Sequence, residues 1–235
     1  MSNNNNKNLT KISYKIVLIG NSQVGKTCFF KRLTKGIFAE KNISTIGIDR
    51  AKITKIISVP EDPFDSSSKE KEIEFSIDFF DTAGQERYRS ITSGYYKNSQ
   101  GLLLLYDITN KKSFEDVEVW MKSVLDNLGE KESNKKRNYS LILIGNKIDL
   151  EENRAISKEE GEEICKKNNI ISWGGEISIK DMSKEELEEK FIEMMKIIYK
   201  DIGNPENKNM VTKKLSNGEK TKKPKRNNDL CCEKK

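Results

Sequence analysis

The chain has 235 residues, a hydrophobic content of 34%, a formal charge of +6 and no histidine. This length suits one folded domain with tails better than two ordinary domains, and any catalysis must proceed without imidazole. Residues 204–235 hold ten Lys/Arg against four Asp/Glu, whereas residues 1–203 are balanced at 33 against 33. A uniformly basic surface would favour nucleic acid, whereas a neutral domain with a basic tail favours an anionic membrane surface or a flexible linker, and we expect the membrane.

Both ends of the chain are predicted to be disordered. Residues 1–11 are rich in Asn and Lys, and residues 203–235 are polar, charged and interrupted by Pro and Gly. The globular domain is therefore expected over residues 12–202. No run approaches the 18 to 20 apolar residues of a spanning helix, and the polar start is unlike a signal peptide, so we expect the domain to face the cytosol.

Within the domain, strand-like runs alternate with helix-like runs. The strand-like runs are 14–20, 51–59, 73–80, 101–108 and 140–147, and the helix-like runs are 26–35, 113–128, 157–168 and 184–199. Such alternation predicts an α/β fold with a largely parallel sheet.

One pair of strand-like runs, 51–59 and 73–80, has no helix between its members. The pair is predicted to form an antiparallel hairpin at the edge of the sheet. Its connection, 61–72, is long for a hairpin, and it is either a solvated insertion or a contact specific to a partner.

A phosphate-binding motif directly follows the first strand. Residues 20–27 read GNSQVGKT, which matches G-x-x-x-x-G-K-[ST] between a strand and a helix. Gly20 and Gly25 let the backbone wrap closely, so that successive N–H groups face phosphate oxygens. Lys26 is then placed to reach the outer phosphates, and Thr27 offers a hydroxyl to Mg²⁺. Ser22 and Gln23 stand where smaller residues are common, and we expect them to be tolerated.

The motif DTAGQE follows the strand that ends near residue 80. An aspartate at a strand terminus, here Asp81, can hold Mg²⁺ through water, as in other P-loop hydrolases. Gly84 lets a backbone N–H approach the γ-phosphate, and Gln85 is placed to orient the attacking water. Hydrolysis of this kind depends on positioning and electrostatics, which a chain without histidine can supply.

The motif NKID, which directly follows the strand-like segment SLILIG, is predicted to select the base. The carboxylate of Asp149 can accept hydrogen bonds from the ring N–H and the exocyclic amine of guanine, a pair of donors that adenine lacks. Such a site can discriminate by several kcal/mol because a wrong base leaves buried polar groups unpaired. Lys147 would lay its stem over the base, and Asn146 would tie this loop to the phosphate loop.

Together these segments resemble the Rab family of the Ras superfamily of small GTPases. The resemblance covers residues 12–202 and the C-terminal cysteines, and it is carried by GNSQVGKT, ISTIGID, DTAGQERYRSITSGYY, YDITNKKSF and GNKIDL. It implies the small-GTPase fold of P-loop NTPases, which has a mostly parallel six-stranded sheet, one antiparallel edge hairpin and helices on both faces.

The resemblance also implies a GTP/GDP site with Mg²⁺. Gln85 and Lys26 would be catalytic, Thr27, Thr45 and Asp81 would hold the metal, and Phe38 would pack against guanine. The full set expected to contact nucleotide is Gly20, Asn21, Ser22, Gln23, Val24, Gly25, Lys26, Thr27, Cys28, Phe38, Thr45, Asp81, Gly84, Asn146, Lys147, Asp149, Ser178, Ile179 and Lys180.

The family's cycle implies the function and the partners. GTP would order the segments near Thr45 and 84–96, effectors would read that surface in vesicle trafficking, and slow hydrolysis would release it. The expected partners are an exchange factor, an activating protein that supplies an arginine, a GDP dissociation inhibitor, an escort protein and effectors. The chain itself is expected to be a monomer.

Three features depart from the Rab pattern. Arg50 replaces an aromatic residue and Phe80 replaces a tryptophan, so the hydrophobic cluster that includes Tyr95 is altered. Ile179 replaces the alanine of the family's Ser-Ala-Lys and follows an unusual Trp173-Gly174-Gly175, which predicts modestly faster nucleotide release. The third departure is the long connection 61–72.

The tail ends in CCEKK, in which two adjacent cysteines lie in a basic segment without a packing role. Glu233 and Lys234 make a poor C-a-a-X signal, and the resemblance implies geranylgeranyl groups on Cys231 and Cys232. Two lipids give firmer anchoring than one, so the expected location is the cytoplasmic face of an intracellular or plasma membrane, with a cytosolic pool. Cys28 and Cys165 are expected to pack inside the domain.

Two other functions are weighed against a switch enzyme. A silent GTP-dependent scaffold would bind nucleotide without turnover, but the presence of Gln85 argues against it. A nucleic-acid-binding protein could use the basic tail, but no aromatic residue follows Tyr199 to stack on bases.

Overall fold

A computed structural model describes residues 9–38, 47–65, 67–82, 94–129 and 137–204. The chain divides into two units, Met1–Gly203 and Asn204–Lys235. The first unit contains every helix and strand described below. None of the described helices is long and apolar enough to cross a membrane.

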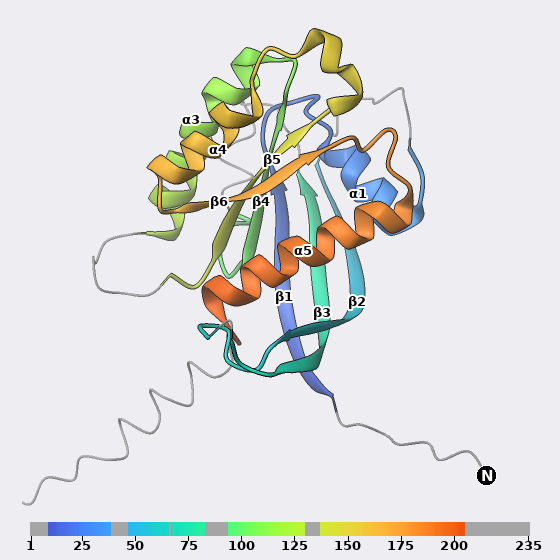
Figure 1. Ribbon diagram of the computed structural model, residues 1–235, viewed down its shortest axis with the longest axis vertical. Helices are drawn as coiled ribbons and strands as arrows, with labels where there is room; N and C mark the ends of the chain where they lie inside the picture. The colour runs from blue at the N-terminus through green and yellow to red at the C-terminus, as the bar shows by residue number, and fades with distance from the viewer. Residues whose placement is uncertain (1–8, 39–46, 66, 83–93, 130–136, 205–235) are drawn as a thin grey trace, which may run out of the picture. The chain divides into compact units, whose positions relative to one another are not determined.

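The first unit is built on one six-stranded sheet with the order β2-β3-β1-β4-β5-β6 (Figure 1). The pair β2 and β3 is antiparallel, and the other neighbouring pairs are parallel, as predicted. The strands are β1 (Thr10–Ile19), β2 (Ile48–Pro60), β3 (Glu70–Thr82), β4 (Gly101–Asp107), β5 (Ser140–Asn146) and β6 (Ile171–Ile177).

Helices cover both faces of the sheet. They are α1 (Lys26–Lys35), α3 (Lys111–Leu128), α4 (Lys158–Lys167) and α5 (Lys184–Ile202), with a short 3₁₀ helix η2 (Ile148–Asn153) after β5. The two N-caps Ser157 and Ser183 form capping boxes with Glu160 and Glu186, which fix the start of α4 and α5. Helices α1 and α5 share one core cluster, and α3 and α4 pack against the other.

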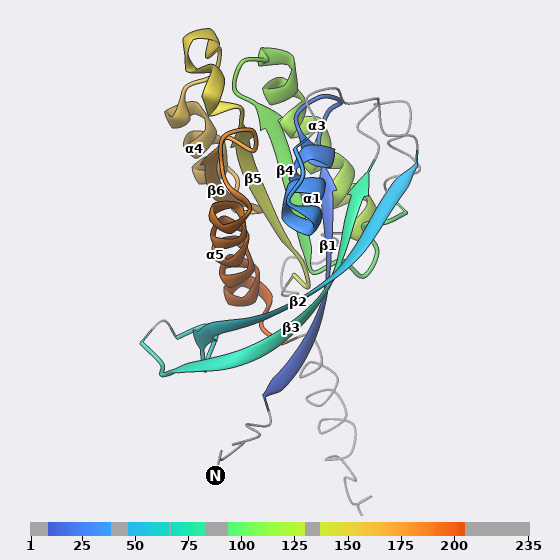
Figure 2. The same cartoon turned by 90° about the vertical axis from the view of Figure 1, so that its right-hand side faces the viewer.

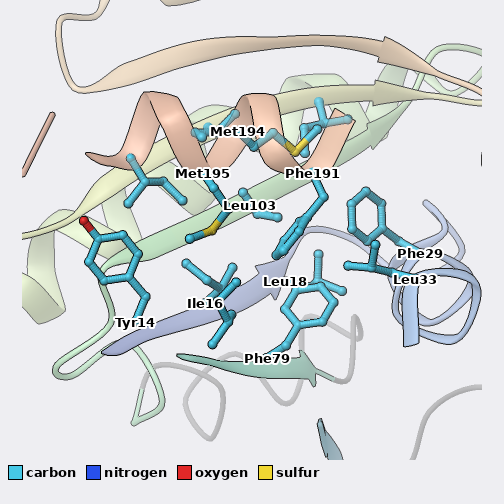
Figure 3. Close-up of a cluster of buried hydrophobic side chains, with 14 of the residues drawn as sticks. Tyr14, Ile16, Leu18, Phe29, Leu33, Phe79, Leu103, Phe191, Met194 and Met195 are labelled. Atoms are coloured by element: carbon cyan, nitrogen blue, oxygen red, sulfur yellow. The ribbon is translucent and has the colours of Figure 1, made fainter. Parts of the chain in front are cut away.

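The larger core lies between the sheet and the helices α1 and α5 (Figure 3). Phe79 of β3 is at its centre, with its ring centroid 5.4 Å from those of both Phe30 and Phe191. Strand β1 supplies Ile16 and Leu18, which are fully buried because both faces of the sheet are covered at this point. This packing fixes the ends of β1 and β3, from which two of the predicted motifs extend.

The hairpin of β2 and β3 is long, with 13 residues in each strand. Residues 70–72, expected to be loop, belong to β3, so the connection is shorter than the sequence indicated. Pro63 and Phe64 at its tip approach the C-terminal end of α5, where a Cβ on Gly203 would lie 3.2 Å from Pro63 Cγ. The Tyr14 hydroxyl donates to the Gly203 carbonyl oxygen at 2.7 Å, which ties β1 to the same point.

The structure differs from the predicted elements at their ends and at the last strand. Strand β1 begins at Thr10, so it includes residues assigned to the N-terminal extension. Strand β6 was not among the strand-like runs because two glycines interrupt it. Its pairing with β5 shifts register between Leu143 and Gly145. Figure 2 shows β2 and β3 extending together beyond the end of α5.

Candidate nucleotide site

The phosphate loop joins β1 to α1 and has the conformation that its glycines predict. Gly20 has φ 129° and Gly25 has φ 105°. A Cβ on Gly20 would lie 2.3 Å from the carbonyl oxygen of Leu105, so no larger residue fits there. Gln23 also has a positive φ, 66°, with an exposed side chain, and Ser22 is half-buried beside it. The loop therefore accepts the unusual Gln23 at some conformational cost.

Lys26 is buried at the first position of α1. Its ammonium group donates to the carbonyl oxygens of Gly20 at 2.8 Å and Asn21 at 2.6 Å. Burial lowers the pKa of Lys26, and the nearby Asp81 carboxylate only partly opposes this shift. A buried cation held against the loop is well placed to meet phosphate oxygens.

Thr27 and Asp81 come together as predicted for a metal site. The Thr27 hydroxyl donates to Asp81 Oδ2 at 2.6 Å. Asp81 is fully buried at the end of β3, and among the described residues its Oδ1 has no hydrogen-bond partner. Burial raises the pKa of Asp81, and the hydrogen bond from Thr27 and the charge of Lys26 only partly oppose this shift. The hydroxyl oxygen of Thr27 and the carboxylate oxygens of Asp81 are hard ligands of the kind that Mg²⁺ prefers.

Asn146 joins the phosphate loop to the base-recognition loops. Its Nδ2 donates to the Val24 carbonyl oxygen at 2.8 Å, and its Oδ1 accepts from the Ile179 backbone N–H at 3.3 Å. A Cβ on Gly25 would lie 2.2 Å from Asn146 Nδ2, so glycine is required for this contact. The predicted role of Asn146 as a tie between loops has direct geometric support.

Asp149 lies half-buried in η2 and is held by a hydrogen bond from the Ser178 hydroxyl to Oδ1 at 2.9 Å. Lys147 has φ 74° and places its ammonium group 2.5 Å from Asp107 Oδ2. Both residues belong to the loop that follows β5. The loop thus lies at the carboxyl end of the sheet beside the phosphate loop, and Ser178 fixes the orientation of the Asp149 carboxylate.

The departure at Ile179 has a structural explanation. The Ile179 side chain is buried in the core cluster beneath α1 and α5, whereas its backbone N–H faces Asn146. A branched side chain is therefore accommodated by packing. Its neighbour Lys180 is exposed and accepts a hydrogen bond at its carbonyl oxygen from Arg32 Nη2 at 2.9 Å.

Two residues of the predicted set lie along α1 and just after it. Cys28 is buried in the core, as a packing residue would be. Phe38 is half-buried, with the Arg32 guanidinium 5.7 Å above its ring. Thr45, Gly84, Gln85, Cys231 and Cys232 lie outside the described residues.

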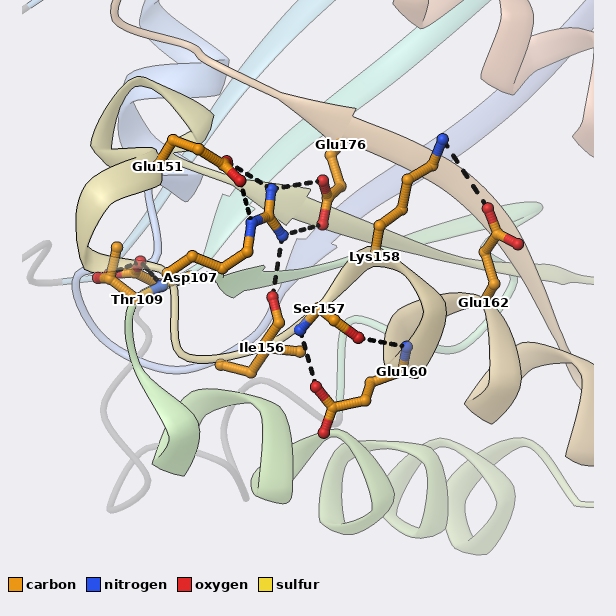
Figure 4. A network of polar contacts seen from close by, with 10 residues as sticks. Asp107, Thr109, Glu151, Ile156, Ser157, Lys158, Glu160, Glu162 and Glu176 are labelled. Atoms are coloured by element: carbon orange, nitrogen blue, oxygen red, sulfur yellow. Dashed lines mark hydrogen bonds and ion pairs between the residues drawn. The ribbon is translucent and has the colours of Figure 1, made fainter.

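The sequence missed an ion-pair network that braces the base-recognition loop (Figure 4). Arg154 pairs with Glu176 of β6 at 2.8 and 2.9 Å and with Glu151 of η2 at 2.7 Å from two of its nitrogens. The segment containing Asp149 is thereby linked to the strand that leads to Ser178. The sequence could have suggested the pair of Arg154 with Glu151, because the two residues are three positions apart. It gave no sign of the pair with Glu176.

A second unpredicted network holds the phosphate loop against α3. Asn21 Nδ2 donates to Asp116 Oδ2 at 2.7 Å, and the Trp120 indole N–H donates to Asn21 Oδ1 at 2.8 Å. Both polar ends of the Asn21 amide are therefore engaged by one helix. The sequence offered no signal for a contact between residues so far apart in the chain.

The fold and the site define a class of protein. A glycine loop at the start of α1, a buried carboxylate beside a helix hydroxyl, and a second carboxylate after β5 have the arrangement expected of a guanine-nucleotide site in a P-loop α/β fold. The chain matches the family model described as "Ras family" over residues 15–200. The chain belongs to the Ras family.

The similar curated proteins are Ras-related proteins. The chain is 39% identical to Ras-related protein SEC4 of Candida albicans over 184 residues, which cover 78% of this chain and 76% of SEC4. It is 38% identical to Ras-related protein Rab-13 of Rattus norvegicus over 67% of this chain and 68% of Rab-13. It is 36% identical to mouse Rab-26 over 68% of this chain, but the match spans only 54% of Rab-26.

These similarities confirm the predicted kind of protein. The chain is a Rab-type small GTPase that acts in vesicle trafficking, binds GTP or GDP with Mg²⁺ and hydrolyses GTP. Regulators and effectors are partners of this kind of protein, and its role in trafficking is associated with membranes.

Proposed function

We propose that this chain is a lipid-tethered switch whose nucleotide lies across the loops that Asn146 joins. The observation that carries the proposal is the Asp81 carboxylate, fully buried at the mouth of the phosphate loop with Oδ1 unpartnered among the described residues. Such a group is costly unless a cation completes it. The domain extends over residues 12–202 in this proposal, with flexible segments 1–11 and 203–235.

The phosphate end of the site uses backbone and cationic groups. The N–H groups of the loop 20–27 and the start of α1 would bind phosphate oxygens, and Lys26 would exchange its carbonyl partners for the outer phosphates. Thr27, Thr45 and Asp81 would hold Mg²⁺, which supplies positive charge to the phosphate oxygens when bound. The close fit of Gly20 against β4 keeps the loop backbone near these oxygens.

The base end of the site uses Asp149 as the specificity residue. Its carboxylate would accept the two guanine donors while the Ser178 hydroxyl holds it in place. Lys147 would cover one face of the base with its methylene stem, and its ammonium pairs with Asp107. Phe38, which follows α1, would pack against guanine. The backbone N–H groups near Ile179 and Lys180 would contact the edge of the base.

Hydrolysis requires groups that orient water and stabilise charge. Gln85 would position the attacking water, Gly84 would donate a backbone N–H to the γ-phosphate, and Lys26 would stabilise the transferred charge. The intrinsic rate would be slow, and an arginine from an activating protein would raise it by roughly 10³- to 10⁵-fold. An exchange factor, a GDP dissociation inhibitor, an escort protein and effectors would act on the same cycle.

Membrane attachment would come from the tail. Geranylgeranyl groups on Cys231 and Cys232 would anchor the chain, and the lysines of the tail would add roughly 1 kcal/mol each near an anionic leaflet. The protein would then work at the cytoplasmic face of an intracellular or plasma membrane and keep a cytosolic pool. Replacing both cysteines by serine should move the chain to the soluble fraction of a lysate, and persistent membrane attachment would refute the anchor.

The nucleotide site is tested by loading the protein with a fluorescent guanine nucleotide and Mg²⁺. GDP and GTP should displace the probe, ATP should not, and Gln85→Leu should suppress hydrolysis without loss of binding. Lys26→Ala should abolish tight binding. Guanine-specific binding without hydrolysis would favour a GTP-dependent scaffold without turnover. No binding of nucleotide in millimolar Mg²⁺ would refute the proposed site.

Asp149→Asn gives a sharper test of base recognition. Xanthine carries a carbonyl where guanine carries its amine, so an amide donor at this position should favour xanthine nucleotides over guanine nucleotides. The wild type should therefore bind guanine nucleotides more tightly than xanthine nucleotides, and the variant should show the reverse order. Equal losses for both would mean that Asp149 does not read this edge of the base.

A further inference from the structure

The last turn of α1 brings an arginine beside the residue that is expected to pack against guanine. Arg32 lies in this turn, and Gly36 ends the helix with φ 68° and donates to the Arg32 carbonyl oxygen at 2.8 Å. The Ile37 N–H donates to the Lys31 carbonyl oxygen at 3.4 Å, so the chain turns back toward the helix. This turn places Phe38 beside Arg32, whose guanidinium carbon is 5.7 Å from the centre of the Phe38 ring.

The same arginine also contacts the segment that follows β6. Arg32 Nη2 donates to the Lys180 carbonyl oxygen at 2.9 Å. The N–H at the other end of that peptide bond belongs to Asp181, and it donates to the Ser178 hydroxyl oxygen at 3.0 Å. The Ser178 hydroxyl in turn donates to Asp149 at 2.9 Å. The peptide after Lys180 is therefore held by α1 on one side and by the base-recognition loop on the other.

Packing alone does not explain an arginine at this position. The Nε of Arg32 is buried and has no hydrogen-bond partner among the described residues, and an unpaired buried donor is unfavourable. An aliphatic side chain would fill the same space without that cost. Phe38 is half-buried and packs against the larger core cluster, so it does not depend on a cation for its burial. A planar guanidinium differs from an aliphatic group because it can lie over a ring and donate a hydrogen bond from its edge at the same time.

We propose that Arg32 is a positioning residue for guanine, which holds Phe38 and the Lys180 peptide at a fixed separation. The inference rests on the proposed function, in which Phe38 packs against the base and the backbone near Lys180 contacts its edge. Arg32 acts through these two segments and does not itself touch the nucleotide. Because both segments are ordered before the nucleotide enters, less conformational freedom is lost on binding. Without Arg32 the two segments move independently, and the nucleotide leaves faster.

The place of Arg32 along α1 separates this role from a general effect on the helix. Lys26 and Thr27 are at the first turn, beside the phosphate loop, whereas Arg32 lies six residues after Lys26. At 1.5 Å per residue this is about 9 Å along the helix axis. Arg32 should therefore affect the contacts with the base and leave the contacts with the phosphates unchanged.

The test measures release of a fluorescent GDP analogue from the full-length protein in Mg²⁺. Arg32→Met should release it at least about tenfold faster, because a hydrogen bond from a charged donor is lost along with the ring contact. Lys35→Met is the matched control: it removes one exposed charge from the same last turn of α1 and should change the rate less than about twofold. Arg32→Lys keeps the charge without the planar group, and its release should still be at least about threefold faster than that of the wild type.

Two further measurements distinguish positioning of the base from loss of structure. Ribose 5-diphosphate lacks the base, so its affinity, measured by competition, should change less than about twofold in Arg32→Met or Arg32→Lys. In a Phe38→Leu background, Arg32→Met should speed GDP release less than about threefold, because one of the two segments that Arg32 positions has already lost its ring. Thermal unfolding of each variant identifies one that fails to fold, and Arg32→Lys then carries the test.

Several results would overturn the proposal. These are a wild-type release rate in Arg32→Met or Arg32→Lys, an equal loss of affinity for GDP and for ribose 5-diphosphate, and full additivity with Phe38→Leu. A wild-type protein that binds no guanine nucleotide would instead contradict the proposed function. Tight binding by the wild type together with unchanged variants would remove only the positioning role of Arg32.

Discussion

The Trp120 indole of α3 donates a hydrogen bond of 2.8 Å to the side-chain oxygen of Asn21 in the phosphate loop. The backbone carbonyl of Asn21 accepts from Lys26, so one residue connects α3 with the cation of the nucleotide site. Because Asp116 engages the amide nitrogen of Asn21, its side chain is fixed at both ends. The position of the loop therefore depends on a helix that bears no nucleotide motif.

Trp120→Phe should speed the release of GDP. A neutral hydrogen bond contributes about 0.5–1.5 kcal/mol, which corresponds to roughly a two- to tenfold faster dissociation if the loop is loosened by that amount. Release of a fluorescent GDP analogue into excess GDP measures the rate. Trp173→Phe is the matched control, because Trp173 packs near Gly161 of α4 and not against the phosphate loop. Equal rates in the two variants would rule out the coupling.

Arg154→Met should destabilise the GDP-loaded protein. It leaves Glu176, whose side chain is only 9% exposed, without its partner, at a cost of roughly 2–4 kcal/mol given the partly solvated geometry. Urea unfolding measures the change. Adding Glu176→Gln to Arg154→Met should recover part of the loss, because the uncompensated charge is removed. If the two changes are additive, the pair does not act as a unit.

The fold was predictable because its signals are local. The phosphate loop, the four long helices and the buried strands each carry their periodicity or motif within a short window. Strand β6 escaped because Gly174 and Gly175 break that periodicity. The braces of the site, Asn21 with Trp120 and Arg154 with Glu176, were not predictable, since each joins residues that only the sheet order brings together.

Trp173 and Gly174 of β6 both occupy positions with little free space around them. A Cβ on Gly174 would lie 2.6 Å from Ile142 Cγ2, so this strand position accepts only glycine without rearrangement of β5. A Cβ on Gly161 of α4 would lie 2.7 Å from Trp173 Cη2 and equally close to the Tyr106 hydroxyl. The unusual Trp-Gly-Gly sequence is thus part of how α4 packs on the sheet.

Gly161→Ala should lower stability although alanine favours helices. The gain of about 1 kcal/mol in helix propensity is opposed by overpacking of roughly 1–3 kcal/mol against Trp173. Thermal unfolding of the GDP-loaded protein measures the balance. Trp173→Leu together with Tyr106→Phe removes both groups that a Cβ on Gly161 would meet, so Gly161→Ala should become stabilising in that background. A stabilising Gly161→Ala in the wild-type chain would show that α4 can shift freely.

Cys165 should react slowly with alkylating reagents even though it is half-buried and not fully enclosed. Burial raises the pKa of Cys165 from 9.0 to about 12, and the charge of Glu162 adds to the effect. Only the thiolate reacts, so about one thiol in 10⁴ is reactive at pH 8, and the rate should rise tenfold per pH unit up to a pH near the raised pKa.

Mass spectrometry of unprenylated protein treated with iodoacetamide should show Cys231 and Cys232 modified first. Denaturation in urea provides the control, because it restores an ordinary pKa and should equalise the four cysteines. Fast labelling of Cys165 in the folded chain would mean that its environment is more polar than the packing beneath α4 indicates.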